Sequence, residues 1–258
     1  MAIKVCVPYY LTVCKCTILS LYEFKSDGLD VEVQFAHGPV SAMSRNALIN
    51  NQESSQIYQK LTDRYSHYLL LNNDVGMHPA QLQRLIDDDK PVVSAAYPFY
   101  QNDKCFAAGF WQKAQGKSVE GALGELVSRQ SYGLNKVDWV GAGALLIQRQ
   151  VLEKTEYPWF RHEIIRGFER VQTSVGEEIV RHQQLATEEA SFCLNCSRHK
   201  IDVWLDCDCL AEYIPHAQPD GLSQIAKQIN LGPPIPKTDG DYVPGVSGAP
   251  GPVFGDTV

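Results

Sequence analysis

Segments typical of strands and helices alternate through the first hundred residues, and this alternation constrains the fold more than any other feature. Apolar, often β-branched runs cover residues 3–10, 31–38, 67–74 and 90–100, and stretches with helical periodicity separate them. This order is typical of parallel sheets, because a crossover connection usually contains a helix. We therefore predict an α/β fold with a mostly parallel central sheet and helices on both faces.

Polar or special residues close three of these predicted strands. They are Pro8-Tyr9-Tyr10, His37-Gly38 and Asn72-Asn73-Asp74. Open α/β sheets bind ligands at the carboxyl ends of their strands. We expect the three strand ends to open onto one binding edge.

The strict alternation stops after residue 100. Residues 105–123 are expected to form a hairpin or loop excursion, 137–152 a strand and then a helix, 188–200 a helix, and 201–208 a strand. From Leu231 onward the chain is dense in Pro and Gly, which favours an extended or disordered tail. We expect one domain over residues 1–230 and a tail over 231–258.

Composition bears on location and partners. The net charge of −7 offers no basic footprint for nucleic acid at the level of the whole chain. No apolar run approaches the ~20 residues that span a bilayer, so we expect no membrane span. The N-terminus has the pattern of a strand rather than of a signal peptide, which favours a cytoplasmic protein.

Four of the eight cysteines have spacing that resembles a zinc site, namely Cys193, Cys196, Cys207 and Cys209. The alternative is that they are buried thiols, because the first two lie in a predicted helix and cysteine often serves as a small hydrophobic residue. Without a secretion signal, reduced thiols are favoured over disulfides.

Several motifs, taken in order, resemble a GT-A glycosyltransferase of the family 2 type, as found in small phage and bacterial proteins. The resemblance covers residues 3–217 and rests on these segments: VPYY, SRNALI (44–49), LLLNNDVGMHPAQLQRLI, KPVVSAAYPF, VDWVGAGALLIQRQVLEK, PWF, TEEASFC and His216. It implies the GT-A fold and sugar transfer from a nucleotide-sugar donor.

The resemblance also implies donor-site residues. These are Pro8, Tyr9 and Tyr10 for the base, Arg45 and Asn46 after Ser44 for the diphosphate sugar, Asn72 and Asn73 at the strand end, and Gly141 and Gly143 for close backbone approach. An Arg side chain suits a diphosphate because its planar fork gives paired charged hydrogen bonds. The glycines have a second explanation, which is a tight bend before a strand.

A metal site is implied at the same strand end. The family usually has Asp-x-Asp there; Asp74 matches the last Asp, whereas Asn72 replaces the first. Asp74 and His216 are thus expected to hold Mn²⁺ or Mg²⁺, unless the asparagines and Asp74 are simply a turn. Asp206 and Asp208 also spell D-x-D, although their position matches less well.

For the acceptor side, the resemblance implies a carboxylate base. Glu189, preceded by Glu188, stands at the position of the family's acidic pair, and Glu177-Glu178 is a rival pair. Either pair could instead be acidic residues that favour a helix N-terminus. Trp139 and Trp159 could form an acceptor platform or belong to the core.

The sequence thus predicts a metal-dependent, inverting glycosyltransferase. Its expected donor is a UDP- or GDP-sugar, and its acceptor a hydroxyl of a glycan, a protein or a modified nucleobase. Because the resemblance is to phage proteins, the cytoplasm could be that of a host cell. Two alternatives remain: a non-catalytic GT-A-fold protein that binds a nucleotide sugar or glycan, and a zinc-stabilised interaction module.

Overall fold

The computed structural model of the chain describes residues 2–38, 41–50, 61, 63–99, 102–114, 117–173 and 176–214. In residues 112–123 and 165–184 only the backbone is described. The predicted tail and His216 lie outside the described residues.

A seven-stranded sheet forms the centre of the fold. In spatial order its strands are β2 (Val31–His37), β1 (Ala2–Tyr9), β3 (Tyr65–Leu71), β11 (Ala144–Gln148), β5 (Val92–Ala96), β14 (Val203–Leu210) and β9 (Leu134–Val137). β11 is antiparallel to both of its neighbours, and β9 is antiparallel to β14, while the other pairings are parallel. The sheet is therefore mostly parallel, as predicted, with two reversed strands.

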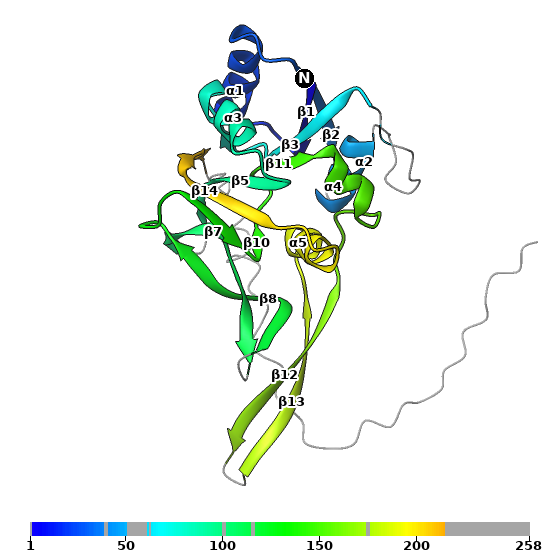
Figure 1. The fold of residues 1–258 in the computed structure, drawn as a ribbon, viewed down its shortest axis with the longest axis vertical. Helices are drawn as coiled ribbons and strands as arrows, with labels where there is room; N and C mark the ends of the chain where they lie inside the picture. The colour runs from blue at the N-terminus through cyan, green and yellow to red at the C-terminus, as the bar shows by residue number, and fades with distance from the viewer. Residues whose placement is uncertain are drawn as a thin grey trace, which may run out of the picture. The chain divides into compact units, whose positions relative to one another are not determined.

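Helices cover both faces of this sheet (Figure 1). Helices α1 (Lys15–Ser26) and α3 (Pro79–Asp87) pack on one face, and α2 (Ser41–Asn50), α4 (Arg149–Lys154) and α5 (Glu188–Arg198) on the other. The period of two along β3 explains how one strand serves both layers: Leu69 and Leu71 join the α1–α3 core, whereas Tyr68 and Leu70 join the other core. The α/β prediction with two covered faces is confirmed.

Helix α3 shows how local sequence sets an element boundary. His78 precedes it in an extended conformation, and its imidazole accepts a hydrogen bond from the Ala80 amide. In return the Gln81 side chain accepts from the His78 amide, which completes a capping box, and Pro79 occupies the first turn. The buried residues of the helix are Pro79, Leu82 and Leu85.

The remaining strands form smaller sheets. They are β6 (Pro98–Phe99), β7 (Asn102–Ala114), β8 (Lys117–Ser128) and β10 (Trp139–Val140) in one sheet, β12 (Ile164–Thr173) with β13 (Gly176–Leu185), and β4 (Val75–Gly76) with β15 (Glu212–Tyr213). The β7–β8 hairpin confirms the hairpin expected in residues 105–123. The β12–β13 hairpin, which extends away from α5 in Figure 1, was not predicted.

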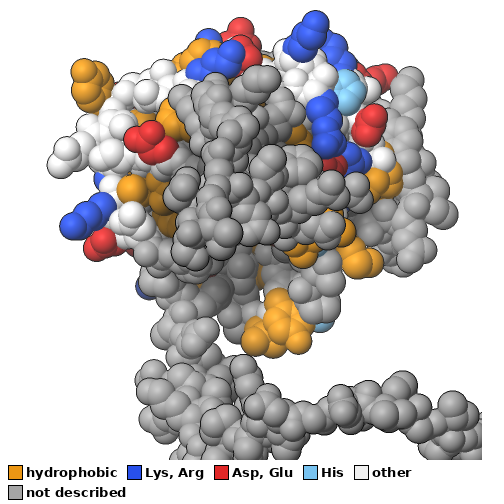
Figure 2. Space-filling model, turned by 90° about the horizontal axis from the view of Figure 1, so that it is seen from below, with side chains coloured by type: hydrophobic (Ala, Val, Ile, Leu, Met, Phe, Trp, Pro, Cys, Tyr) orange, Lys and Arg blue, Asp and Glu red, His pale blue; other side chains and the backbone are white. Residues whose placement is uncertain are grey.

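The surface charge and the helix lengths bear on two kinds of partner, nucleic acid and membrane. In the view of Figure 2, basic and acidic side chains both stand around the edge of the face. Among the described residues, no helix is long and apolar enough to cross a membrane.

Candidate functional site

The candidate site lies where β1, β3 and β5 end. Backbone and side-chain hydrogen bonds hold the Asn72–Asp74 turn in place at this edge. The amide of Asn72 donates to the Gly143 carbonyl at 2.8 Å, and the Asn73 side chain donates to the Thr12 carbonyl at 2.6 Å. The carbonyl of Asp74 accepts from the Ile214 amide at 3.0 Å. The strand end is thus tied to three other parts of the chain.

Arg45 connects this turn to the start of α5. Its side chain is only 3% exposed, and one terminal nitrogen lies 2.7 Å from Glu188 and 2.8 Å from Glu189. The other terminal nitrogen donates to the side-chain oxygen of Asn72 at 3.1 Å. The guanidinium carbon also lies 5.7 Å from the ring centre of Phe160. Arg45 therefore contacts protein groups rather than presenting a free fork to a diphosphate.

Glu188 and Glu189 occupy the first turn of α5, and their environments differ. Thr187 caps the helix by accepting from the Ala190 amide at 3.2 Å. The Glu188 side chain is 11% exposed, accepts a hydrogen bond from Ser41, and lies 3.7 Å from a ring nitrogen of His162. The Glu189 side chain is 20% exposed. Glu188 is therefore the more enclosed of the two.

The pKa of Glu188 reflects opposing influences. Burial acts most strongly and favours the neutral acid, but the charge of Arg45, the hydrogen bond from Ser41 and the nearby His162 together hold its pKa below the usual value. Arg45 keeps a raised pKa, because the two glutamates outweigh the effect of its burial. The cluster therefore contains an ionised Glu188 beside a charged Arg45.

Tyr97 follows β5 and was not anticipated from the sequence. Its hydroxyl accepts from the Gly143 amide at 3.0 Å. A Cβ at Gly141 would lie 2.0 Å from this hydroxyl, and one at Gly143 would lie 2.6 Å from the ring. Burial, with the charges of Glu189 and Asp74, raises the pKa of Tyr97, so the phenol stays protonated. The two glycines thus make room for Tyr97, a partner that the sequence did not identify.

The aromatic end of β1 lies beside β2. Tyr10 is 54% exposed and stacks on His37, with ring centroids 6.0 Å apart and an interplanar angle of 16°. Tyr9 tilts against the same imidazole at 5.4 Å, while Pro8 is buried in the sheet. Tyr10 therefore offers an accessible ring at this edge, and Pro8 does not offer an accessible surface.

Three further candidate residues belong to the packed interior. The Asn46 side chain donates to the Phe160 carbonyl at 2.6 Å and accepts from the Phe160 amide at 3.1 Å. Trp159 is fully buried, and Trp139 is 4% exposed. With no open ring face, the two tryptophans contribute to the core instead of an acceptor platform, and Asn46 fixes the turn that carries Phe160.

The metal-site residues are only partly described. Asp74 is half-buried at the sheet edge, while His216 lies outside the described residues. Within the ranges that the structure describes, no group of three or more His, Cys, Asp and Glu side chains is arranged to hold a metal ion. The side-chain oxygen of Asn72 already accepts from Arg45. Within the Asn72–Asp74 turn, Asp74 is thus the residue whose side chain could supply a carboxylate ligand to a metal ion.

The second D-x-D sequence forms an ion-pair cluster. Asp206 is fully buried and accepts two hydrogen bonds from Arg84 of α3. Asp208 lies 3.2 Å from the same guanidinium and also accepts from the Gly133 amide at 3.0 Å. These contacts assign both aspartates to packing between α3 and β14.

The rival acidic pair lies far along the β12–β13 hairpin. Glu177 and Glu178 pair with Gln172 and Val171, next to the turn. Because a strand rises about 3.3 Å per residue, they lie roughly 25 Å along β13 from Leu185, which precedes α5. Glu188 and Glu189, by contrast, contact Arg45, which reaches the end of β3.

The four cysteines of the zinc-like spacing are buried. Cys193, Cys196 and Cys207 belong to the core beneath α5, whereas Cys209 belongs to the opposite core. Burial raises the pKa of Cys193 to about 12 and that of Cys207 to about 11, so both are neutral thiols. The alternative of buried thiols agrees with this placement.

Comparisons with known proteins add little to this geometry. No protein-family model matches the chain, and no curated protein matches it in sequence. Among solved structures, the chain is similar to A197 from STIV, with 12% identity and a TM-score of 0.43 over 79% of this chain and 80% of that one. So distant a likeness carries no argument about activity.

Proposed function

We propose that this protein is a metal-dependent glycosyltransferase of the GT-A type. The observation that carries the proposal is the Arg45 guanidinium, which joins Asn72 at the end of β3 to Glu188 and Glu189 at the start of α5. A donor site and a carboxylate base need to be neighbours for sugar transfer, and this contact network makes the two segments neighbours. The proposal adds the GT-A resemblance of the sequence to that geometry.

The donor would bind along the edge formed by β1 and β3. Tyr10 offers an exposed ring on which a nucleotide base can stack. Asp74 would hold Mn²⁺ or Mg²⁺ jointly with the diphosphate oxygens, because such ions often take one or two protein carboxylates and complete their shell with phosphates and water. A site with Asp74 as its one carboxylate suits an ion that binds as a complex with the nucleotide. The ion would neutralise charge on the diphosphate leaving group.

Glu189 would act as the general base. In the transfer step the acceptor oxygen bonds to the anomeric carbon, and the bond from that carbon to the phosphate oxygen breaks. The acceptor proton passes to Glu189, and the electron pair of the broken bond leaves with the nucleoside diphosphate. Both glutamates contact Arg45, but Glu189 suits this role better, because it is more exposed and Glu188 is also engaged by Ser41 and His162.

Arg45 then has a positioning role. Its contacts orient both glutamates and Asn72 within a buried cluster. This differs from the diphosphate contact expected from the sequence, since both terminal nitrogens are engaged by protein groups. The oxygen of Asn72 accepts one of these hydrogen bonds, which gives Asn72 a structural use that does not require a negative charge.

A specific contact also favours the alternative of a non-catalytic binding protein. The 2.8 Å ion pair between Arg45 and Glu189 already engages the carboxylate that would have to accept the acceptor proton. A protein that only binds nucleotide sugars or glycans could keep this ion pair permanently. Turnover of a nucleotide sugar separates the two functions.

The test is calorimetric titration of UDP and GDP with and without Mn²⁺, followed by hydrolysis and transfer assays with the corresponding sugars. We expect Mn²⁺ to strengthen nucleotide binding at least tenfold, and Asp74→Ala to remove that gain. Asp208→Asn is the matched control, because it changes an aspartate of the other D-x-D sequence, which is 46% exposed. Equal nucleotide binding with and without Mn²⁺ would refute the metal-dependent proposal, whereas metal-dependent binding without turnover would favour the binding protein.

A further inference from the structure

The outer face of α1, formed by Ile18, Leu19 and Tyr22, is apolar although it faces solvent. These three side chains are between 45% and 70% exposed. They lie on the side of the helix opposite its buried face, which includes Leu21 and Phe24. A helix that is apolar on two opposite sides is normally covered on both, so the outer face indicates an interaction surface.

The neighbouring helix α3 shows what a solvated face looks like in the same layer. Both helices cover the same face of the central sheet (Figure 1). The residues that α3 exposes are Ala80, Gln83, Arg84 and Asp87, and the Gln83 side chain donates to Asp87 at 2.8 Å. The apolar outer face is therefore a property of α1 and not of the whole layer.

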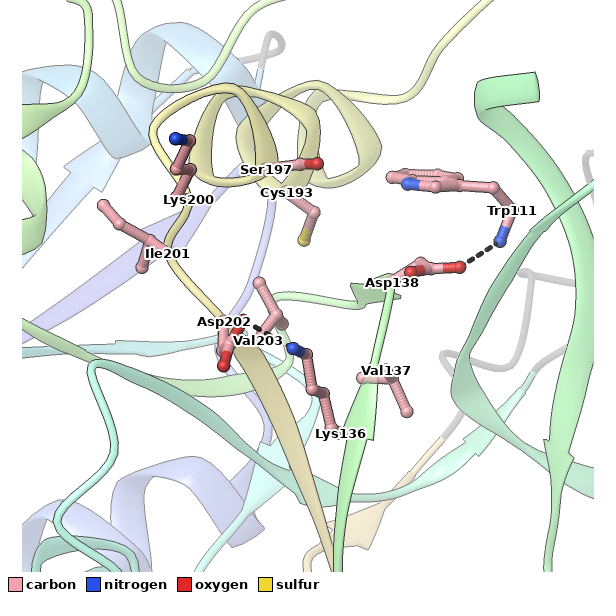
Figure 3. Close-up of a pocket in the computed structure, with 10 residues that line it drawn as sticks. All are labelled: Trp111, Lys136, Val137, Asp138, Cys193, Ser197, Lys200, Ile201, Asp202 and Val203. Atoms are coloured by element: carbon pink, nitrogen blue, oxygen red, sulfur yellow. Dashed lines mark hydrogen bonds and ion pairs between the residues drawn. The ribbon is translucent and has the colours of Figure 1, made fainter. Parts of the chain in front are cut away.

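The pocket of about 200 Å³ at the start of β14, by contrast, belongs to the packed interior. Trp111 and Cys193 line it, and both are buried. Figure 3 shows Lys136 beside Asp202, with which it pairs at 2.7 Å, and Asp138, which accepts from the Trp111 amide at 2.8 Å. The ring and the thiol of this pocket are part of the core, so the outer face of α1 is the stronger candidate.

Charges beside the outer face are arranged so that the face complements itself. Lys15, Leu19 and Glu23 are spaced four residues apart and form one row along α1. At 1.5 Å rise per residue, Lys15 and Glu23 each lie about 6 Å along the helix axis from Leu19, in opposite directions. Among the described residues, neither charge has an ion-pair partner within the chain. Two such rows, packed antiparallel with leucine on leucine, place each lysine beside the glutamate of the other row.

We propose that the protein forms a two-fold symmetric homodimer through the outer face of α1, with the two helices antiparallel and Leu19 at the centre. Such an interface uses the same patch on both copies, so symmetry forms the Lys15–Glu23 pair twice. Ile18 and Tyr22 lose their contact with water beside the central leucines. The apolar area is on the order of a few hundred Å² per copy, below the ~800 Å² of a standard interface. We therefore expect a dimer that dissociates at micromolar concentration.

A membrane surface is the competing occupant of an exposed apolar helix face. Helices that lie in a membrane interface carry mainly Lys and Arg beside their apolar side chains. The row on α1 instead ends in Glu23, and the whole chain has a net charge of −7. A second copy of the chain satisfies both charges of the row, which favours the dimer.

The dimer does not depend on the proposed transferase function, because the start and the inner side of α1 serve the candidate site. The Cys14 amide donates to the Asn73 carbonyl at 2.7 Å, and the Thr17 hydroxyl donates to the Val75 carbonyl at 2.9 Å. These bonds hold the Asn72–Asp74 turn and lie away from the outer face. Substitutions on the outer face should therefore leave nucleotide binding unchanged.

Sedimentation velocity of the full chain, from low to high micromolar concentration, tests the dimer. We expect a reversible shift from monomer to dimer, and Leu19→Glu should weaken it at least tenfold, because two carboxylates then meet at the two-fold axis. Tyr132→Glu is the matched control: Tyr132 is also exposed, but it precedes β9, at the opposite edge of the sheet from β1 and β2. A monomer at every concentration, or equal weakening in both variants, would overturn the inference. Monomeric protein that binds vesicles of anionic phospholipid through Leu19 would also overturn it, in favour of a membrane surface.

A charge exchange tests the antiparallel arrangement itself. Lys15→Glu alone and Glu23→Lys alone each place like charges across the interface, and each should weaken the homodimer about tenfold. An equal mixture of the two variants restores opposite charges in both pairs, so a heterodimer should form with nearly wild-type affinity. Lys25→Glu is the control, because Lys25 lies on the same helix but outside the row, and mixing it with Glu23→Lys should restore nothing. A mixture of Lys15→Glu and Glu23→Lys that stays as weak as its components would overturn the proposed pairing.

Discussion

A terminal nitrogen of Arg45 lies 3.1 Å from the side-chain oxygen of Asn72, and this hydrogen bond joins α2 to the end of β3. An aspartate at position 72 would add a third carboxylate around a guanidinium that already contacts two. The amide keeps the acceptor oxygen without that charge. The hydrogen bond from Arg45 therefore explains why an asparagine at position 72 fits this site although the family pattern has an aspartate there.

Arg45→Met should destabilise the protein strongly. It leaves Glu188 and Glu189 facing each other in a mostly buried site without their cation, and removal of one partner from a buried ion pair costs about 3–5 kcal/mol. Equilibrium urea unfolding measures the loss. Arg64→Met is the control, because the Arg64–Glu32 pair is exposed on both sides, at 66% and 40%, and should contribute under about 1 kcal/mol. Similar losses in both variants would contradict the buried cluster.

Acid should destabilise the native protein partly through Glu188. The pKa of Glu188 is lower in the folded state than in the unfolded state, where it is about 4.3. The ionised carboxylate therefore stabilises the folded protein fully above the unfolded pKa, and this stabilisation is lost as pH falls through the folded pKa. Glu163 has a lowered pKa as well, because Arg198 and Arg161 outweigh its burial. Urea unfolding between pH 7 and pH 3 should show a shallower decline for Glu188→Gln than for wild type. Glu153→Gln, at an exposed position of α4, should keep the wild-type slope.

Glu189→Gln should keep donor affinity and lower turnover by roughly 10²–10⁴-fold, because glutamine preserves size but cannot accept the acceptor proton. Steady-state transfer assays and nucleotide calorimetry together measure this. Glu177→Gln and Glu178→Gln, near the turn of the β12–β13 hairpin, should remain close to wild type. A collapse in either of these with a normal rate for Glu189→Gln would show that the acidic pair is misassigned.

Gly141→Ala should lower stability by about 1–3 kcal/mol, because the new Cβ would meet the Tyr97 hydroxyl at 2.0 Å. Adding Tyr97→Phe should recover much of the loss, since it removes that oxygen. Gly143→Ala is the matched comparison: its Cβ would meet ring carbons at 2.6 and 2.8 Å, which Tyr97→Phe retains. Thermal unfolding of the two double variants should therefore differ, and equal rescue in both would contradict this packing.

The sequence alone determined the architecture to a large extent. Alternating apolar strands and periodic helices before residue 100 fixed an α/β sheet covered on both faces, because these periods are local properties of the chain. The same local reasoning identified the β7–β8 hairpin and the helix that carries Glu188 and Glu189. It also brought Asn72 and Asp74 to a strand end, where ligands bind in such folds.

Only the tertiary structure decided which side chains meet. Arg45 and Glu188 are 143 positions apart, and no local pattern reports a pairing across that separation. Gly141 and Gly143 indicated that another group approaches the backbone closely, but that group is the side chain of Tyr97, which follows β5. Trp159 and Asn46 were expected in the site, but both are buried. The sequence did not reveal this, because the burial of a residue depends on what packs above it as well as on its own chemistry. β11 runs antiparallel between two parallel strands because its order in space is set by long-range pairing and not by its own sequence period.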